Sequence, residues 1–256
     1  MHSLRVMPFI IETVLTDTIQ ASLARPVLYA IGDVHGEAAR LQLLHDIIVE
    51  RHGLLYPDRP TRLIHLGDYV DRGADSAGVI DILISAQNEM GANCICLRGN
   101  HEAMMLDGLT SHLDSTLQNW LRNGGEETMT SYHNRQQDRV PKAHISWLSS
   151  LPNIYVEAED KLIFVHAGIN PNEYPNERED VYLWTRARRF FEVAKWDNPE
   201  LEGWTVVHGH TPTDDFYPED QSAGGRRINI DTGAVFGGRL TAAVLDPGET
   251  VRFLYA

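Results

Sequence analysis

Asn93-Cys-Ile-Cys-Leu-Arg-Gly-Asn-His-Glu102 joins a short apolar run directly to a group of polar side chains. The apolar part has the length and composition of a buried strand. Gly99 permits a sharp turn immediately after it, because glycine adopts backbone conformations that other residues avoid. We therefore expect the arginine, asparagine, histidine and glutamate of this stretch to lie at the tip of a strand.

Four other apolar runs end in the same way, in glycine accompanied by acidic residues or histidine. Amphipathic helical patterns lie between them, at residues 37–50 and 76–89. Strands, polar turns and helices in repeated order indicate an α/β sheet, in which ligands collect at the carboxyl ends of the strands. The polar turns should therefore gather along one edge. The four runs are residues 27–31 before GDVHG, 62–66 before GDYVDRG, 162–165 before HAG, and 204–207 before HGHTP.

The chain has the size of one α/β domain. It contains 256 residues, of which 43% are hydrophobic, and this suffices for a buried core. No internal repeat or linker divides it, so we expect a single domain over residues 1–256, in which residues 1–24 form an N-terminal extension of unknown role. Residues 102–152 are expected to be mostly helical, with a break at the Gly124-Gly125 pair.

The net charge is −14, which disfavours nucleic acid and anionic membrane surfaces as partners. A phosphate-bearing substrate would need locally concentrated positive charge or metal. No signal-peptide pattern follows the apolar residues 6–11, and no apolar run is long enough to span a bilayer. Cys94 and Cys96 are the only cysteines, and their spacing favours free thiols in a core strand over a disulfide or a metal pair. A reduced, cytoplasmic protein is the expectation.

Taken alone, each polar turn is also compatible with a structural role, such as capping the next helix. Taken together, the turns bring oxygen and nitrogen donors, and no thiolate, to five strand ends. This donor set suits two divalent cations of borderline hardness, with an aspartate able to bridge them. In the HGH turn, spacing alone leaves His208 and His210 as alternatives. The other candidate ligands are Asp33, His35, Asp68, Asn100 and His166.

The ordered motifs resemble the signatures of the calcineurin-like metallophosphoesterases, from about residue 27 to residue 245. More narrowly, they resemble the phosphoprotein phosphatase family, and most closely the bacteriophage lambda-type bacterial serine/threonine protein phosphatases. The continuation MMLDG, the Trp184-Thr-Arg186 element and residues 230–236 carry this narrower resemblance. It implies an α/β fold with a central β-sandwich of mixed sheets flanked by helices, and a dinuclear metal site at the carboxyl ends of the strands.

The resemblance also implies how the ligands divide between two metal ions. The family's Gly-His-Thr motif matches residues 209–211 and selects His210 over His208. Two divalent ions are the implied cofactors, with Mn favoured and Fe or Zn as alternatives that the same ligands accept. Asp33 and His35 would bind the first ion, Asn100, His166 and His210 the second, and Asp68 would bridge both.

His101 and Asp71 are the implied catalytic pair. In the family, the corresponding histidine protonates the leaving oxygen and is held by the aspartate. Such a carboxylate partner stabilises an imidazolium and fixes its orientation, which suits a general acid. Glu102, the next residue, is expected to anchor the start of the following helix rather than to take part in chemistry.

Three arginines are candidate contacts to the substrate phosphate. Arg72 and Arg186 match positions that grip phosphate oxygens in the resembling enzymes, and a planar guanidinium fits such oxygens bidentately. Arg98 is a further candidate, although it could equally pair with an acid or support its turn.

The activity implied by the resemblance is metal-dependent hydrolysis of phosphoserine and phosphothreonine in proteins or peptides, with tolerance for phosphotyrosine and aryl phosphates. Attack on phosphorus would be in line, by a hydroxide shared between the ions, with no covalent intermediate. The alternative is a symmetrical dinucleoside tetraphosphate hydrolase. Against it stands the acidic loop with Asp214, Asp215, Glu219 and Asp220, which would repel a polyanion. A third alternative, an inactive scaffold of the same fold, predicts lost ligands, whereas every ligand position is present.

Overall fold

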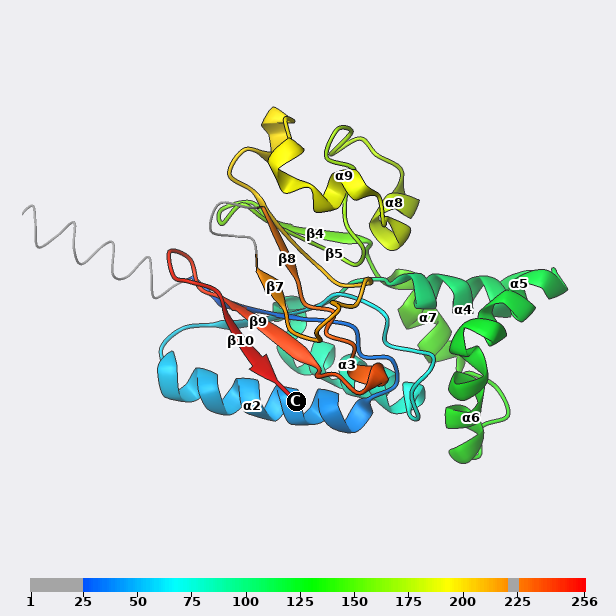
Figure 1. Cartoon of the computed structure of the whole chain (residues 1–256). Helices are drawn as coiled ribbons and strands as arrows, with labels where there is room; N and C mark the ends of the chain where they lie inside the picture. Colours follow the sequence, from blue (N-terminus) through cyan, green and yellow to red (C-terminus); the bar gives the residue numbers. More distant parts are fainter. Residues whose placement is uncertain (1–24, 221–225) are drawn as a thin grey trace, which may run out of the picture.

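Two five-stranded sheets form the centre of the protein in the computed structural model, which describes residues 25–220 and 226–256 (Figure 1). Both sheets contain parallel and antiparallel pairs, and helices flank them. The predicted α/β sandwich of mixed sheets is therefore confirmed. The expected N-terminal extension, residues 1–24, lies outside the described residues.

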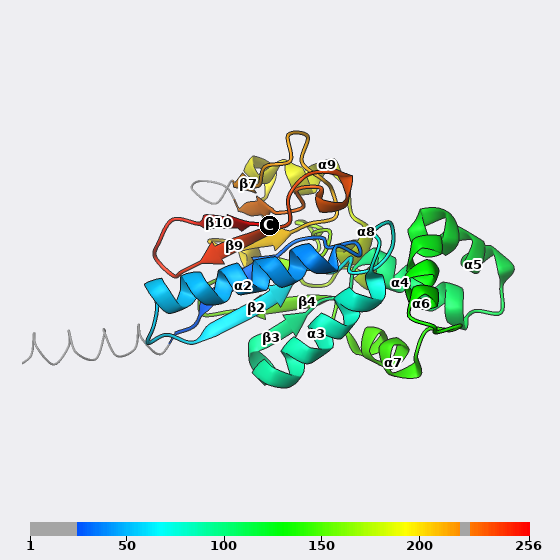
Figure 2. The same ribbon diagram turned by 90° about the horizontal axis from the view of Figure 1, so that it is seen from below.

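The first sheet has the strand order β10-β9-β1-β2-β3. Its parallel part is β1, β2 and β3, and β9 and β10 add antiparallel pairs at the other side. Helices α2 and α3 lie side by side across its outer face (Figure 2). The elements are β1 Val27–Ile31, α2 Ala38–Leu55, β2 Thr61–His65, α3 Ser76–Met90, β3 Cys94–Cys96, β9 Thr241–Leu245 and β10 Arg252–Tyr255.

The second sheet has the order β4-β5-β6-β8-β7. The short helices α8 and α9 cover its outer face, where Phe190 packs against Trp196 and the imidazole of His208. The elements are β4 Ile154–Glu157, β5 Leu162–Val165, α8 Glu179–Trp184, α9 Arg188–Phe191, β6 Thr205–His208, β7 Glu219–Asp220 and β8 Arg227–Asn229. Short 3-10 turns follow at Val193–Lys195 and Pro199–Leu201.

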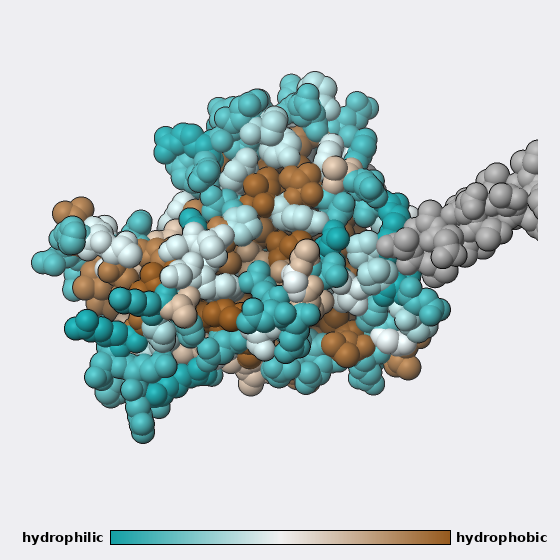
Figure 3. Space-filling model, turned by 180° about the vertical axis from the view of Figure 1, so that it is seen from behind, coloured by the Kyte–Doolittle hydropathy of each residue, from teal (hydrophilic) through white to brown (hydrophobic). Residues whose placement is uncertain are grey.

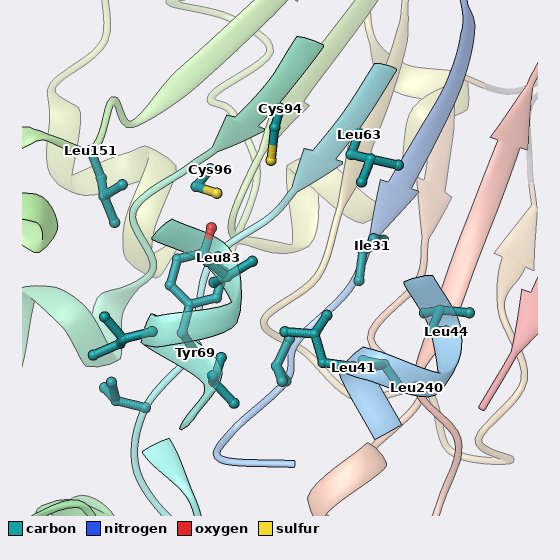
Figure 4. Packing of buried hydrophobic residues seen from close by; sticks show 14 of the residues in the cluster. Ile31, Leu41, Leu44, Leu63, Tyr69, Leu83, Cys94, Cys96, Leu151 and Leu240 are labelled. Carbon is teal, nitrogen blue, oxygen red and sulfur yellow. The ribbon is translucent and has the colours of Figure 1, made fainter. Parts of the chain in front are cut away.

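Alternation of side chains along β1 divides the hydrophobic core into layers. Leu28 and Ala30 point between the two sheets, where they join Phe164 of β5 in one cluster. Tyr29 and Ile31 point the other way, into the cluster beneath α2 and α3. Figure 4 shows part of this outer cluster. Because β1 is buried on both faces, its sequence is apolar throughout, which is why the strand was predictable.

A helical arm extends from the end of β3. Its elements are α4 Asn100–Thr110, α5 Asp114–Trp120, α6 Glu126–Asn134 and α7 Lys142–Ser150. Between α5 and α6 the turn Leu121–Gly125 departs from helical geometry at Gly124, where φ is 108°. The break expected at the Gly124-Gly125 pair is therefore found.

The surface combines hydrophilic and hydrophobic areas. Seen from behind, hydrophilic residues cover most of the periphery and hydrophobic residues gather near the middle (Figure 3). Among residues 25–220 and 226–256, no helix combines the length and the apolar character needed to cross a lipid bilayer.

Phe164→Ala tests the layer between the sheets. The Phe164 side chain is fully buried, so truncation leaves a cavity, and we expect the free energy of unfolding to fall by about 3–5 kcal/mol. Urea unfolding followed by circular dichroism, at fixed metal concentration, measures the change. Val156→Ala on the neighbouring strand is the control, because that side chain is 39% exposed and its loss should cost less than about 1 kcal/mol. Equal losses in the two variants would contradict the assigned core.

Candidate metal centre

The candidate ligands meet where β1, β2, β3, β5 and β6 end. Three of them have left-handed backbone conformations that are unusual for residues with side chains, with φ of 44° at His35, 54° at Asp68 and 69° at His210. Such strain persists where surrounding contacts hold it, and it is concentrated at functional sites. The turns therefore aim these side chains inward instead of letting the chain continue along the sheet.

Asp68 lies between two groups of nitrogen and oxygen donors. On one side, its Oδ2 is 3.4 Å from His35 Nε2. On the other, its Oδ1 is 3.3 Å from His166 Nε2. Each carboxylate oxygen thus faces a different group, which is the arrangement a bridging ligand needs.

The first group contains His35, Asp68 and His101. His35 donates from Nδ1 to the Val70 carbonyl at 2.8 Å, which leaves Nε2 as the unprotonated nitrogen that can bind a metal ion. This hydrogen bond fixes the ring so that Nε2 faces Asp68.

The second group contains Asp68, His166 and His210, with Asn100 between the two rings. Asn100 Oδ1 is 2.8 Å from His166 Nε2 and 2.9 Å from His210 Nδ1. His166 donates from Nδ1 to the Leu66 carbonyl at 3.0 Å, and Nε2 therefore points inward. The structure brings these four predicted ligands together in one place.

Asp33 completes the predicted set. Its carboxylate accepts the backbone N–H of His210, at 3.2 Å to Oδ1 and 3.1 Å to Oδ2. Gly209 is required here, since a Cβ at that position would lie 2.1 Å from Asp33 Oδ1. Burial and the neighbouring Asp231 carboxylate raise the pKa of Asp33 well above its usual range. A cation beside these carboxylates would relieve that repulsion.

Two of the three candidate histidine ligands are neutral near pH 7, as metal binding requires. Burial lowers the pKa of His35 to about 3 and that of His210 to about 2, so both imidazoles are neutral near pH 7. Burial also lowers the pKa of His166, but the attraction of the Asp68 carboxylate and of the other nearby carboxylates is together larger and raises that pKa to about 9. Neutral imidazoles, carboxylates and one amide oxygen are the ligands that divalent ions of borderline hardness accept. The donor set therefore fits a pair of such ions.

His101 and Asp71 form a buried pair next to the first group. His101 donates from Nδ1 to Asp71 Oδ2 at 2.7 Å, and its Nε2 lies 4.0 Å from Asp68 Oδ2. Asp71 also accepts from Trp120 Nε1 at 2.9 Å and from Thr128 Oγ1 at 2.8 Å. These bonds fix the carboxylate, and through it the plane of the histidine ring.

Two of the three candidate arginines border the centre. Arg72 Nη1 is 2.6 Å from His35 Nε2, and Arg186 Nε is 3.1 Å from His210 Nε2. Both line a cavity of about 130 Å³ that also reaches Asp231. Positive charge is therefore concentrated beside the donor groups, although the whole chain is acidic.

Arg98 and His208 lie apart from these donors. Arg98 donates to the Ser149 carbonyl at 2.7 Å, at the end of α7, and the structure does not bring its guanidinium to the cavity. His208 contacts Arg227 Nη1 at 3.0 Å and packs on Phe190. Both side chains serve contacts between elements of the fold.

Glu102 has a larger role than the expected support of a helix start. Its carboxylate accepts the backbone N–H of Gly99 at 2.8 Å, as a helix-capping residue does. It also accepts the N–H groups of Asp68 at 2.8 Å and Tyr69 at 2.7 Å, in the turn after β2. Glu102 thereby joins the two turns that carry Asp68 and Asn100.

Sequence reasoning missed three residues that contact the site. They are Trp120 and Thr128, which hold the Asp71 carboxylate, and Asp231, which lines the cavity. Trp120 and Thr128 reach the site through the packing of the helical arm, and Asp231 follows β8, so no local sequence pattern indicates these contacts.

Two similar proteins have different activities in their names. Serine/threonine-protein phosphatase 1 of Salmonella typhimurium is 29% identical over 231 residues, which cover 84% of this chain and 90% of that protein. The asymmetrical bis(5'-nucleosyl)-tetraphosphatase PrpE of Anoxybacillus flavithermus is 27% identical over 240 residues, covering 86% of this chain and 91% of that protein.

A solved structure shares the fold. The cold-active protein-tyrosine phosphatase of a psychrophilic Shewanella superposes with a TM-score of 0.60 at 19% identity, covering 90% of this chain and 81% of that chain. The family of calcineurin-like phosphoesterases matches residues 27–238, a span that includes all of the candidate ligands. The chain therefore belongs to the calcineurin-like phosphoesterase family, whose members are hydrolases that use divalent metal ions.

Proposed function

We propose that the protein is a phosphomonoesterase that removes phosphate from phosphoserine and phosphothreonine in proteins, with tolerance for phosphotyrosine and aryl phosphates. The observation that carries this proposal is the shape and charge of the surface around the centre. The cavity beside the donors measures about 130 Å³ and is lined by two arginines, Arg72 and Arg186. The volume of the cavity and its positive charge suit one phosphoryl group better than a polyphosphate chain.

The surfaces next to this cavity carry acidic side chains. One groove, of about 400 Å³, shares Pro212 with the cavity and contains Asp214 and Asp215. Another, of about 540 Å³, shares Arg72 with it and contains Arg122 as well as Glu126 and Glu127, so its charges balance. A peptide with basic residues beside its phosphorylated side chain fits the first groove, where the further phosphates of a polyphosphate would be repelled.

The proposed metal ligands are the six side chains that face the two groups: Asp33, His35, Asp68, Asn100, His166 and His210. Two divalent ions, Mn by preference, supply electrostatic stabilisation of the phosphoryl oxygens and lower the pKa of water when bound. The chain's own contribution is orientation. Arg72 and Arg186 would grip the phosphate oxygens bidentately.

His101 is proposed as the proton donor to the leaving oxygen. Asp71 holds its Nδ1, and Nε2 faces the donor groups, so the ring can present a proton only on the inner side. His101 also lies close enough to His35 and Asp68 for all three side chains to bind one metal ion. If His101 is a metal ligand, its substitution should remove an ion, whereas the substitution of a proton donor should leave the metal content unchanged.

A second candidate function is hydrolysis of a dinucleoside polyphosphate. Phe236 is 54% exposed at the cavity, and the Arg72 guanidinium lies 5.5 Å from its ring centroid. An exposed aromatic ring beside a phosphate-binding arginine could stack a nucleobase. The similarity to PrpE supports this alternative as much as the similarity to the Salmonella phosphatase supports the first.

One assay separates the candidates. Purified protein with Mn²⁺ is given a phosphoserine peptide with flanking lysines, the same peptide with flanking glutamates, and diadenosine tetraphosphate. We expect the highest kcat/KM on the basic peptide. A preference for the dinucleotide by orders of magnitude would overturn the proposal.

Asp214→Asn/Asp215→Asn tests the acidic groove. We expect kcat/KM on the basic peptide to fall roughly 3- to 10-fold, and less at high salt, because exposed charges act weakly and are screened. Activity on a small aryl phosphate should stay unchanged. The control is Asp58→Asn/Asp138→Asn, an equal charge change at exposed positions outside the groove. Equal effects of the two double variants would show that net charge alone matters.

His101→Asn tests the proton donor. We expect kcat on phosphoserine peptide to fall by about 10²–10⁴, and much less on p-nitrophenyl phosphate, whose leaving group needs no proton. Metal content, measured by mass spectrometry, should stay at the wild-type value, and exposed His112→Asn should change neither quantity. Loss of one ion in His101→Asn would instead make His101 a ligand.

The raised pKa of His166 predicts a pH dependence of metal binding. With a pKa of about 9, His166 is protonated in the metal-free protein at pH 7 and must lose that proton to become a ligand. Apparent Mn²⁺ affinity should therefore rise between pH 7 and pH 9, by up to about tenfold per pH unit, and then level off. Calorimetry in buffers of different ionisation enthalpy measures the released protons. A flat affinity profile over this range would contradict the assignment.

A further inference from the structure

Cys94, Cys96 and His65 lie together on the outer face of the first sheet, away from the proposed dinuclear centre. In the parallel pair of β2 and β3, His65 is the register partner of Cys96, and Leu63 is the partner of Cys94. Side chains two residues apart on a strand share a face. The register therefore gives the two thiols a histidine neighbour that their spacing in the sequence does not reveal.

The three side chains have the separations of metal ligands. One donor atom from each lies within 4.8 Å of the others, and all three residues are buried. Cys96 Sγ is 3.8 Å from His65 Nδ1. In a tetrahedral zinc site, bonds of about 2.3 Å to sulfur and 2.0–2.1 Å to nitrogen place such atoms roughly 3.6 Å apart. The cluster needs only a small adjustment to close on an ion.

His45 of α2 supports the orientation of the His65 ring. The two Nε2 atoms are 2.9 Å apart, so one imidazole donates to the other. When His65 faces the thiols through Nδ1, its Nε2–H points at His45. A metal-bound histidine usually donates its other ring N–H to such a partner, which fixes the tautomer and the ring plane.

A groove between α2 and α3 opens beside this cluster. It has a volume of about 770 Å³ and is lined by His45 and Leu63, the neighbours of His65 and Cys94. Figure 4 shows the sulfurs of both cysteines within this layer, near Leu63 and Leu83. His45 therefore connects the buried cluster to the groove, although none of the three side chains lines the groove itself.

We propose that Cys94, Cys96 and His65 form a separate binding site for one Zn²⁺ ion. Two thiolates and an imidazole are soft to borderline ligands that favour zinc over manganese, in contrast to the oxygen-rich set of the dinuclear centre. The ion would join β2 to β3, a few residues before the turns that carry Asp68 and Asn100. The expectation of free thiols in a core strand agrees with the structure, and the strand register adds the histidine that spacing alone does not reveal.

Cobalt substitution tests this site in the full chain. Cys94 and Cys96 are the only cysteines, so a thiolate-to-cobalt charge-transfer absorption can arise nowhere else. Metal-free, reduced protein is titrated with Co²⁺. Because the dinuclear centre also takes up Co²⁺, we expect this absorption to saturate by three equivalents, with the intensity of one thiolate-bound ion per chain, and to vanish when excess Zn²⁺ is added. Its absence in folded wild-type protein at excess Co²⁺ overturns the proposal.

Variants assign the ligands and separate the two sites. Cys94→Ser/Cys96→Ser should lose the absorption and one Zn²⁺ per chain by mass spectrometry, and His65→Gln should weaken Zn²⁺ binding at least tenfold, with folding checked by circular dichroism. Asp33→Asn/His210→Asn should keep the absorption, because it alters only the dinuclear centre. If this last variant abolishes the absorption, the site is not separate. The wild-type titration decides the question even if a cysteine or histidine variant does not fold.

Discussion

The Glu102 carboxylate is the contact on which the geometry of the centre depends. It is fully buried and takes backbone N–H groups from both the turn after β2 and the turn after β3. A buried carboxylate is costly unless hydrogen bonds compensate it. Burial and the nearby Asp68 charge raise the pKa of Glu102 to about 7, in spite of these bonds. The two turns are therefore held in one relative position, and Asp68 and Asn100 move only together.

A second layer of support comes from the helical arm. Trp120 and Thr128 hold the Asp71 carboxylate, and the Gly124 carbonyl accepts the Arg72 N–H at 3.1 Å. Beyond α4, which carries Asn100 and His101, the arm thus positions both the proposed proton donor and one phosphate contact without supplying a ligand itself. It gives a role to a segment whose sequence carries no recognisable chemistry.

The strands that end in the candidate ligands could be predicted because they are buried and are followed by polar turns. Within each sheet their convergence follows from topology, since the carboxyl ends of parallel strands share an edge, whereas the meeting of the two sheets' edges depends on how the sheets pack. Strands β4, β9 and β10 end in no such motif and were not predicted, and β8 was not predicted either, although the turn after it carries Asp231. The direction of the Arg98 side chain could not be predicted either, because its partner Ser149 is 51 residues away in the sequence. The same holds for the partners of Asp71, since Trp120 and Thr128 are 49 and 57 residues away. Sequence patterns report local periodicity, and such contacts are set only when distant segments pack.

The close approach of Gly124 to Arg72 limits how the helical arm can vary during evolution. A Cβ at Gly124 would lie 2.6 Å from the Arg72 backbone nitrogen, so the inner end of the arm tolerates neither a larger residue nor a shift in register. The outer end is different, since Leu113 between α4 and α5 is 63% exposed. Insertions can lengthen the arm there and create new surface beside the catalytic centre, while the residues that hold Asp71 and Arg72 stay in place.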